Sequence, residues 1–356
     1  MINQIEPVIT EEDIASVDEY LRSGGWLTEH SLTRKLEKEI SDYLERRYAV
    51  AVPNGTVAIY TALKTQGLGP GDRVVVPNIT MIATINAVIW AGAEPVLIDV
   101  DEHLCMSIDL LKTVNKPDAV IFVPLNGRTG NGLQIEEWCL ENDVILIEDS
   151  AHALGSQYSE KKCGSLGNMS ILSFTPHKII TSGQGGLILT DDEDSYTKMS
   201  DYKSFNRTEE ASDIHKGFGL NFKFTDLQSS LLLSQLARLD SLIESKKSIY
   251  STYVEYMTLS EERYLKFQDF ETPWFIDYLL MKDEEQDKYR DLLLEKNIQI
   301  RKGYPPLSSQ PMFREVERTD LTYSEEIANR IVWLPSSTNL SKDDLRQVSS
   351  SLDLLN

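Results

Sequence analysis

The chain has 356 residues, a length that allows two or three domains and a large buried core. Hydrophobic residues make up 41% and charged residues 26%, without long Gly, Pro or Ser tracts, which excludes a disordered chain. With 35 Lys and Arg against 56 Asp and Glu, the net charge of −21 disfavours non-specific binding to nucleic acid or an anionic membrane. An anionic substrate therefore needs a locally basic pocket.

The N-terminal segment MINQIEPVITEEDI has no positive stretch followed by an apolar one, and no apolar run approaches the ~20 residues of a membrane span. We expect a cytoplasmic protein with neither a nucleic-acid nor a membrane partner. The three cysteines, Cys105, Cys139 and Cys163, are widely spaced and form no CxxC pair. They are interpreted as ordinary thiols, so neither a disulfide framework nor a metal site is expected.

Short apolar, β-branched runs recur in the first half of the chain at intervals that leave room for a helix between them. These predicted strands are residues 48–52, 74–76, 95–98, 119–123 and 144–147. Near-continuous apolar strands of this kind indicate a mostly parallel sheet covered on both faces. Helices with an apolar face that fits such a sheet are predicted at 56–65, 80–90 and 133–140. The predicted fold class is α/β.

Two more strands are predicted at 170–174 and 186–190, separated by the segment TPHKIITSGQG, whose glycines mark a turn or a strained loop. Thr225, followed three residues later by Gln228, forms a capping-box pattern. This pattern predicts the start of a long helix whose apolar positions continue to Leu242.

The pattern changes from about residue 245 onward. A helix is followed by a strand, an acidic helix and a terminal helix, the last three predicted at 274–281, 283–296 and 343–354. We therefore expect two domains: residues 1–244 with an N-terminal helix and the large α/β domain, and residues 245–356 with a smaller α+β domain.

Asp149 follows the apolar run at 144–147, within the segment VILIEDSAHALGS. In an open α/β sheet, ligands bind outside the carboxyl ends of the strands, so this carboxylate faces a candidate site. The alternative is a helix N-cap, which Asp often supplies after a strand. Position alone does not separate the two interpretations.

Lys178 lies in the glycine-bounded loop, where a lysine is usually a solvated surface charge. Its interest comes from the combination with Asp149 and with the turn at 54–56, which opens a predicted helix. A helix N-terminus binds phosphate, a carboxylate keeps a pyridine nitrogen protonated, and a lysine forms a Schiff base once its pKa falls below ~10.4. Together the three features match the requirements of pyridoxal 5′-phosphate (PLP).

In order and spacing, these segments resemble the DegT/DnrJ/EryC1/StrS family of sugar aminotransferases. The resemblance covers nearly the whole chain and rests on the blocks NGTVAIYTAL, GPGDRVVVPNITMIATINAVIWAGAEPVLIDVD, EDSAHALGS, SFTPHKIITSGQGG and GLNFKFTDLQSSLLLSQLARLD. One block is weak evidence, whereas five in order are specific. The resemblance implies the aspartate-aminotransferase-like fold (fold type I), with PLP bound by the domain at 1–244.

The family pattern also implies roles for individual residues. Lys178 forms the aldimine with PLP, Asp149 contacts the pyridine nitrogen, and His152 lies near the 3′-oxygen of the ring. Phosphate contacts come from Gly55, Thr56 and Ser173, and Asn221 reaches the phosphate in the neighbouring subunit of a homodimer. Less specific blocks suggest substrate contacts from Trp26, His177, Arg301 and Tyr304.

Several positions depart from the commonest family pattern. His152 stands where Gln is frequent, and Met81 stands where an aromatic residue usually stacks on the cofactor ring. Gln184 replaces an acid in the glycine loop, with little expected effect on the chemistry. Ser308 and Lys223 replace a common His and Arg near the implied substrate pocket, so they put the identity of the substrate in doubt.

Some relatives carry His at the aldimine position and are dehydratases, whereas here spacing assigns that position to Lys178 and leaves His177 beside it. The resemblance therefore favours transamination. Glutamate would convert PLP to pyridoxamine phosphate, which would then aminate a keto group on a nucleotide-linked deoxysugar in amino-sugar biosynthesis.

Alternative functions remain open at this point: a PLP-dependent sugar-nucleotide dehydratase, a cyclitol aminotransferase, or a PLP-binding regulator without turnover. Product analysis with and without glutamate separates the enzymes. The acidic composition and the lack of an appended DNA-binding module speak against the regulator. The sequence does not decide which sugar and which nucleotide the substrate contains, or whether its 3- or 4-ketone is aminated.

Overall fold

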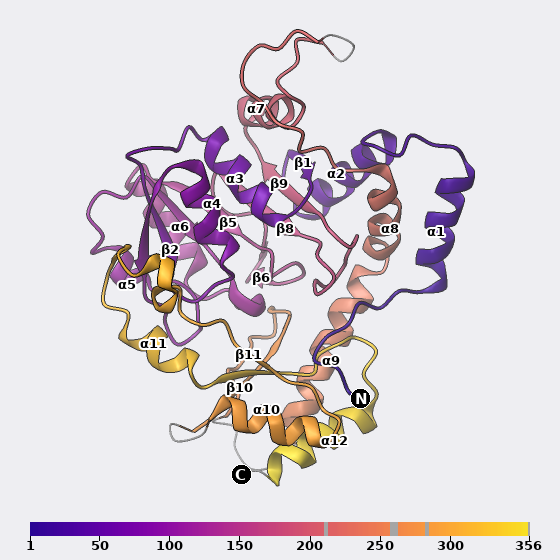
Figure 1. Cartoon of the computed structure of the whole chain (residues 1–356), viewed down its shortest axis with the longest axis vertical. Helices are drawn as coiled ribbons and strands as arrows, with labels where there is room; N and C mark the ends of the chain where they lie inside the picture. Colours follow the sequence, from indigo (N-terminus) through magenta and orange to yellow (C-terminus); the bar gives the residue numbers. More distant parts are fainter. Residues whose placement is uncertain (210–212, 257–262, 282–284, 355–356) are drawn as a thin grey trace.

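A central sheet of eight strands organises the computed structural model, which describes residues 1–209, 213–256, 263–281 and 285–354 (Figure 1). The order across the sheet is β1-β9-β8-β5-β4-β2-β3-β12. Of these eight strands, β9 runs in the direction opposite to the other seven. The strands are β1 (Tyr48–Val52), β2 (Arg73–Pro77), β3 (Glu94–Ile98), β4 (Ala119–Phe122), β5 (Ile145–Asp149), β8 (Met169–Ser173), β9 (Gly186–Thr190) and β12 (Glu317–Arg318).

Seven of these strands coincide, within two residues at each end, with the runs predicted from the sequence, and the α/β fold class is confirmed. The eighth, β12, comes from the C-terminal part of the chain and pairs in parallel with β3. Its two residues, Glu317 and Arg318, are exposed and charged, so no hydrophobic pattern marks them as a strand.

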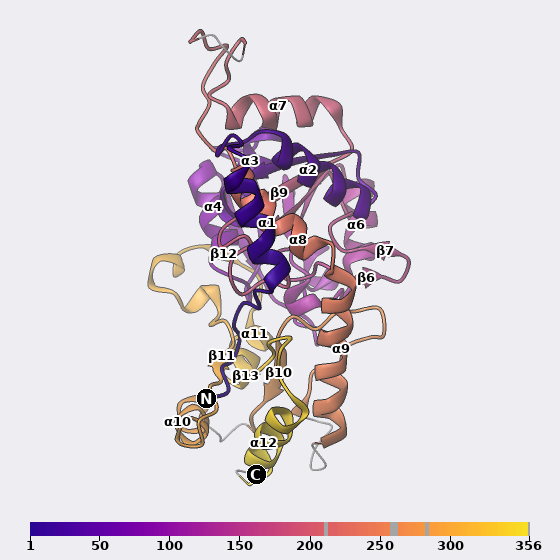
Figure 2. The same ribbon diagram turned by 90° about the vertical axis from the view of Figure 1, so that its right-hand side faces the viewer.

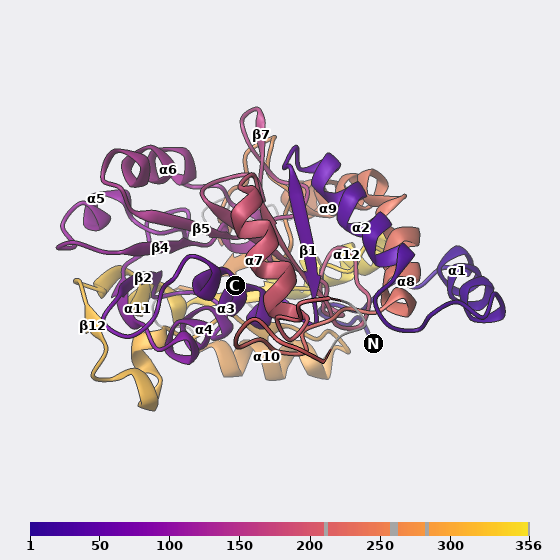
Figure 3. The same ribbon diagram turned by 90° about the horizontal axis from the view of Figure 1, so that it is seen from above.

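Helices cover both faces of the sheet, which explains why most residues of its central strands are apolar and buried (Figure 3). Val74 and Val76 pack on one face with α3 and α4, whereas Val75 packs on the other with α5 and α6. The covering helices are α2 (Ser31–Tyr43), α3 (Gly55–Thr65), α4 (Ala83–Ala91), α5 (Ile108–Leu111), α6 (Gly132–Glu141) and α7 (Glu193–Lys203).

The long helix predicted after Thr225 is wrong in its length. Thr225 does cap a helix, since its side chain accepts from the N–H of Gln228, but α8 (Asp226–Leu236) ends before α9 (Leu239–Tyr256) begins. At the break, the Arg238 guanidinium donates to the carbonyl of Val8 and to Asp13 of α1 (Glu11–Arg22). Local apolar spacing continues through the break and cannot reveal this tertiary anchor.

A second sheet, β10-β13-β11, lies at the other end of the molecule from α7 (Figure 2). Its core is shared with α9, α10 and α12, and it includes Ile2, which bridges to Ile298. The predicted strand at 274–281 and terminal helix at 343–354 are present, while the start of the acidic helix at 283 lies outside the described residues. The elements are β10 (Ile276–Leu279), α10 (Gln286–Glu295), β11 (Arg301–Lys302), α11 (Thr322–Ala328), β13 (Ile331–Leu334) and α12 (Lys342–Asp353).

Short elements complete the fold: the hairpin β6 (Gln157–Tyr158) and β7 (Lys161–Lys162), and the 3₁₀ turns η1 (Leu125–Gly127), η3 (Leu307–Ser309) and η4 (Pro311–Phe313). The domain boundary predicted at 244/245 falls inside α9, and the two-domain division remains a prediction. All three cysteines are buried and free. Within the described ranges, no helix combines the length and the apolarity that a membrane span requires.

Candidate functional site

A cleft of about 730 Å³ opens at the carboxyl ends of β5 and β8. One wall is the N-terminus of α3, and another is the loop that follows β8 and carries Lys178. Trp274, Arg301 and Tyr304 close the third side from the C-terminal part of the chain. The cleft therefore lies where the large sheet meets the smaller one.

The α3 wall presents a helix N-terminus to the cleft. Asn54 caps α3 by accepting from the N–H of Val57 at 3.0 Å, which leaves the first-turn N–H groups of Gly55 and Thr56 without intrahelical partners. The backbone packs tightly here: a Cβ on Gly55 would lie 3.1 Å from the Cβ of Ser173, and one on Gly186 would lie 2.5 Å from the Asn54 carbonyl. Small residues thus leave this helix end open to an anion such as phosphate.

Asp149 is the last residue of β5, and its side chain is only 4% exposed. No helix begins after it, because residues 151–155 form turns, so the N-cap alternative does not hold. Thr84 donates its hydroxyl to Oδ2 at 2.9 Å, and the N–H of Ala151 donates to Oδ1 at 3.3 Å. Burial raises the pKa of Asp149, while the Thr84 hydrogen bond and the charge of Lys178 oppose that rise. The carboxylate lines the cleft.

Lys178 lines the same cleft from the loop after β8. Its side chain is half-buried, and Nζ lies 4.0 Å from the centre of the Trp274 ring. Burial of the amine lowers the pKa of Lys178 to about 7, and Asp149 acts in the opposite direction. An amine with this pKa exchanges a proton readily near neutral pH.

His152 is buried between two aromatic rings in the cleft wall. Its ring centre lies 4.0 Å from that of Trp274 and 5.8 Å from that of Tyr304. Nε2 is 3.5 Å from the Tyr304 hydroxyl, while Nδ1 is buried and has no hydrogen-bond partner among the described residues. Burial, with Lys178 as a smaller cause, lowers the pKa of His152, which keeps the ring neutral at pH 7. An unpaired buried nitrogen at this place fits a bound polar group.

The structure brings most of the predicted site residues together. Those that line the cleft are Gly55, Thr56, Met81, Asp149, His152, Ser173, His177, Lys178, Gln184, Arg301 and Tyr304. Trp26 and Asn221 are not among them: Trp26 is 67% exposed between α1 and α2, and Asn221 is exposed and bridges to Ser204.

Ser308, expected near the implied substrate pocket, does not line the cleft. Ser308 is buried away from the cleft lining, where its hydroxyl donates to Glu325 at 2.8 Å and its N–H donates to Asn78 at 2.9 Å. Lys223 is exposed and does not line the cleft either. Ser308 and Lys223, the two departures from the family pattern, therefore make no direct contribution to the cleft lining within this chain.

Two residues of the site have no signal in the sequence analysis. Thr84, in the first turn of α4, supports Asp149 from 65 positions away along the chain. Trp274 falls in a segment predicted as a strand of the smaller domain, yet it covers Lys178 and His152. Both contacts depend on how distant segments pack, which local patterns do not report.

The residues present fit PLP: an open helix end for a phosphate, a buried carboxylate for a ring nitrogen, and a lysine whose pKa suits Schiff-base chemistry. A doubly covered, mostly parallel sheet with this site at its carboxyl edge defines the class of fold type I PLP enzymes. The chain belongs to the DegT/DnrJ/EryC1/StrS aminotransferase family, whose model matches residues 7–353. It is a PLP-dependent aminotransferase.

Relatives and solved structures agree over almost the full length. The chain is 30% identical to GDP-perosamine synthase of Escherichia coli O157:H7 over 352 residues, which cover 98% of this chain and 96% of that protein. It is 28% identical to GDP-perosamine synthase of Vibrio cholerae, with coverage of 99% and 98%. The aminotransferase TlmJ of Streptoalloteichus hindustanus superposes with a TM-score of 0.92 at 26% identity, over 99% of this chain and 98% of TlmJ.

Proposed function

We propose that this enzyme transfers an amino group from glutamate to the keto group of a nucleotide-linked deoxysugar in amino-sugar biosynthesis. The observation that carries the proposal is the meeting of Lys178, Asp149 and the α3 N-terminus in one cleft. The relatives support the substrate class, since they include three GDP-perosamine synthases and, at 28% identity, the spore coat polysaccharide biosynthesis protein SpsC of Bacillus subtilis.

The bound cofactor supplies a carbonyl carbon that accepts the amino group and a ring that withdraws electrons from it. The N–H groups of Gly55 and Thr56, with the Ser173 hydroxyl beside them, would hold its phosphate. Asp149 keeps a proton on the ring nitrogen, and Thr84 holds the carboxylate in the orientation for that contact. His152, neutral and with Nδ1 free, hydrogen-bonds the ring oxygen.

Lys178 would hold the cofactor through Nζ, and its free amine would move protons within the cleft. Its lowered pKa of about 7 leaves a large fraction of the amine unprotonated at neutral pH, so Nζ can accept a proton and return it. General acid–base transfer of this kind contributes ~10²–10⁴-fold to a rate. A histidine at this position would lack the primary amine needed for covalent attachment.

The opening of the cleft provides polar groups for the substrates. Arg301 is exposed there and forms no ion pair with another described residue, so its guanidinium is available to a carboxylate or a phosphate. His177 and Tyr304 line the same opening. In a protein of net charge −21, this local cation offsets repulsion of anionic substrates.

A homodimer with shared active sites completes the proposal. Trp90 lines the cleft and is 50% exposed, and Phe218, three residues before Asn221, is 73% exposed. Tyr60, Tyr202 and Phe222 join these residues in one aromatic cluster. A second copy of the chain would cover this apolar surface and bring Asn221 to the phosphate of its neighbour.

Lys178→Ala is the direct test of the catalytic assignment. The variant should lack the visible absorbance of the covalently held cofactor and should lose turnover of nucleotide-linked keto sugars, because no primary amine remains in the cleft. Lys288→Ala, an exposed lysine on α10, is the matched control and should behave as wild type. Full activity in Lys178→Ala would contradict the proposal, and product formed without glutamate would indicate dehydration instead.

The shared site is tested by mixing two inactive variants. Lys178→Ala and Asn221→Asp each impair every site of their own homodimer, whereas a mixed dimer has one site with both residues intact. We expect the mixture to recover about a quarter of wild-type activity, because random pairing makes half of the dimers mixed and each has one intact site. No recovery, together with a monomeric mass in light scattering, would contradict the dimer.

A further inference from the structure

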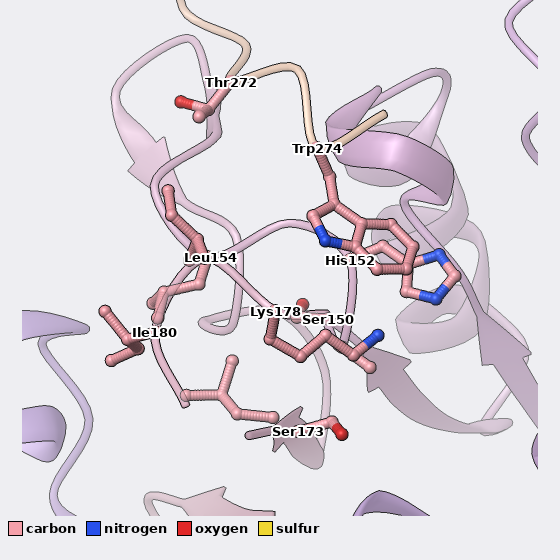
Figure 4. A pocket seen from close by; sticks show the side chains of 11 residues that line it. Ser150, His152, Leu154, Ser173, Lys178, Ile180, Thr272 and Trp274 are labelled. Carbon is pink, nitrogen blue, oxygen red and sulfur yellow. The ribbon is translucent and has the colours of Figure 1, made fainter. Parts of the chain in front are cut away.

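Trp274 forms the cover over the amine of Lys178. Its side chain is 6% exposed, its ring centre lies 4.0 Å from Nζ, and its ring packs on His152 at 4.0 Å. Figure 4 shows Lys178 extending beneath the indole, with His152 beside it. The residue reaches this place from the segment just before β10, in the smaller half of the molecule.

Contacts on every side hold the indole in this position. The backbone N–H of Trp274 donates to the carbonyl of Asn126 at 3.0 Å, and the backbone carbonyl of Trp274 accepts from Nζ of the buried Lys246 at 2.9 Å. The indole N–H donates to the carbonyl of His177 at 2.7 Å. Phe275 stacks on the ring at 3.8 Å. The ring is therefore fixed both to the body of the protein and to the loop that carries Lys178.

The face of an indole is negative, so it attracts an ammonium group, most strongly where water is excluded. On the cleft side, the charged and titratable groups around Lys178 are Asp149 of β5, His152 of the following turn, His177 of its own loop, Arg301 and Tyr304. Behind the loop, Lys178 shares a hollow with Glu6, Arg238 and Lys246. Burial lowers the pKa of both histidines, so they are mainly neutral at pH 7. Asp149, which favours the charged amine, and the Trp274 ring, 4.0 Å from Nζ, therefore both attract the protonated amine.

We propose that Trp274 is a positioning residue whose indole face holds the amine of Lys178 whenever that amine is not bonded to the cofactor. The inference rests on the proposed role of Lys178. In this arrangement the amine waits at one defined place on the cleft wall, and the bond from the indole N–H to His177 holds the neighbouring backbone. A leucine or methionine would keep an apolar side chain here, although a smaller one, and would not attract the ammonium group.

The full-length chain freed of cofactor allows a direct measurement, with PLP as the probe. Only the neutral amine adds to the PLP aldehyde, so the rate at which visible absorbance appears rises with pH to a plateau. The midpoint of that rise reports the pKa of Lys178, which is about 7 in the wild type. The plateau reports how well the neutral amine is placed.

Trp274→Leu removes the ring and should lower the midpoint by about one pH unit, since the ammonium loses a buried cation–π contact. The plateau rate should fall about tenfold, because the amine is no longer held in place. Trp138→Leu is the matched control: it removes a half-buried tryptophan from α6, remote from the cleft lining, and should leave both values unchanged.

Fluorinated tryptophan gives a test that does not depend on how the leucine variant folds. Replacement of every tryptophan by 5-fluorotryptophan keeps the ring shape but weakens its negative face, so the midpoint should fall by a few tenths of a unit. The same replacement in a Trp274→Phe background should produce no shift, which assigns the effect to this one residue.

An unchanged midpoint in the fluorinated wild-type chain would overturn the role of Trp274, as would unchanged midpoint and plateau in folded Trp274→Leu. In either case, absence of the PLP absorbance from Lys178→Ala would leave the proposed function intact. Conversely, PLP absorbance of wild-type intensity in Lys178→Ala would remove the proposed function, whatever the tryptophan variants showed. The two failures are therefore distinguishable.

Discussion

Two lysines in this molecule have the same lowered pKa and different surroundings. Burial lowers the pKa of both Lys178 and Lys246 to about 7, and both border a small hollow behind the Lys178 loop. Lys178 also faces the large cleft, where Asp149 and the Trp274 ring are close to its amine. Lys246 is 2% exposed, and its amine donates to the backbone carbonyls of Trp274 and Ser336 at 2.9 and 2.5 Å.

The difference shows that a shifted pKa reports burial and does not by itself identify a reactive group. What separates the two lysines is access to a cleft that holds a carboxylate and an open helix end. Lys246 fastens the segment that carries Trp274, so its proposed contribution to the site is structural. Substitutions near Lys178 and substitutions of Lys246 should therefore have separate effects, the first on turnover and the second on stability.

The largest effect is expected from Asp149→Asn. This change removes the carboxylate charge near Lys178, which distinguishes the surroundings of Lys178 from those of Lys246. Without an ionic partner for the ring nitrogen, turnover should fall by about 10²–10³-fold, while the fold and the cofactor absorbance persist. Steady-state kinetics and circular dichroism measure the two properties. Wild-type turnover in a folded Asp149→Asn protein would contradict the assigned role.

Lys246→Met tests the buried side of the contrast through stability. The folded-state pKa of Lys246 is about 7 and its unfolded value is 10.5, so between these pH values the unfolded chain binds more protons. The unfolding free energy therefore rises with pH in this window, by at most about 1.4 kcal/mol per unit for one lysine. Lys246→Met should reduce the slope by up to that amount.

Urea unfolding of the cofactor-loaded protein between pH 7.5 and 9.5 measures this slope, since Lys178 is then covalently occupied. Lys247→Met, an adjacent lysine on the exposed side of α9, serves as the control and should keep the wild-type slope. An identical slope in the Lys246 and Lys247 variants would show that Lys246 is not the titrating group.

Thr84→Val should have a smaller effect on the catalytic side. The change removes the hydroxyl that donates to Asp149 at 2.9 Å and keeps the side-chain volume. Loss of one hydrogen bond to a charged group should lower kcat about tenfold and raise the pKa of Asp149. The pH profile of kcat checks the change in the pKa of Asp149, because the acidic limb of the profile should move to higher pH. An unmoved limb would show that Thr84 contributes only to packing.

Ser308→Ala should give the smallest effect and should not alter the kinetics. The hydroxyl is buried against Glu325 and Asn78, so its loss should lower the unfolding free energy by about 1 kcal/mol. KM values for both substrates should stay within twofold of wild type, as the side chain does not line the cleft. A change in the preference of the Ser308→Ala enzyme among nucleotide sugars would show that Ser308 does affect substrate binding.

Much of the large sheet was predictable because its information is local. Runs such as residues 119–123 are apolar and buried throughout, as expected for a central strand of a sheet covered on both faces. The smaller half was harder: β11 and β12 have two residues each, and Glu317 and Arg318 carry no strand signal. Whether such a short, exposed segment forms a strand depends on the edge of the sheet with which it pairs.

The candidate site divides in the same way. Asp149, Lys178 and the turn at 54–56 were identified because strand ends and helix starts are legible in a sequence, and parallel strands place their carboxyl ends at one edge. The family position placed Ser308 near the substrate pocket but did not show that its side chain packs against Glu325 and Asn78. Trp26 and Asn221 lie outside the cleft of a single chain.

The sequence by itself determined the fold class, the family, and the residues whose chemistry suits PLP. These follow from local periodicity, strand-end position and ordered motifs. Only the tertiary structure decided that Thr84 supports Asp149, that Trp274 covers Lys178, and that Lys246 is buried behind it. The physical reason is that desolvation and hydrogen-bond geometry depend on segments far apart in the chain, so they exist only once those segments pack together.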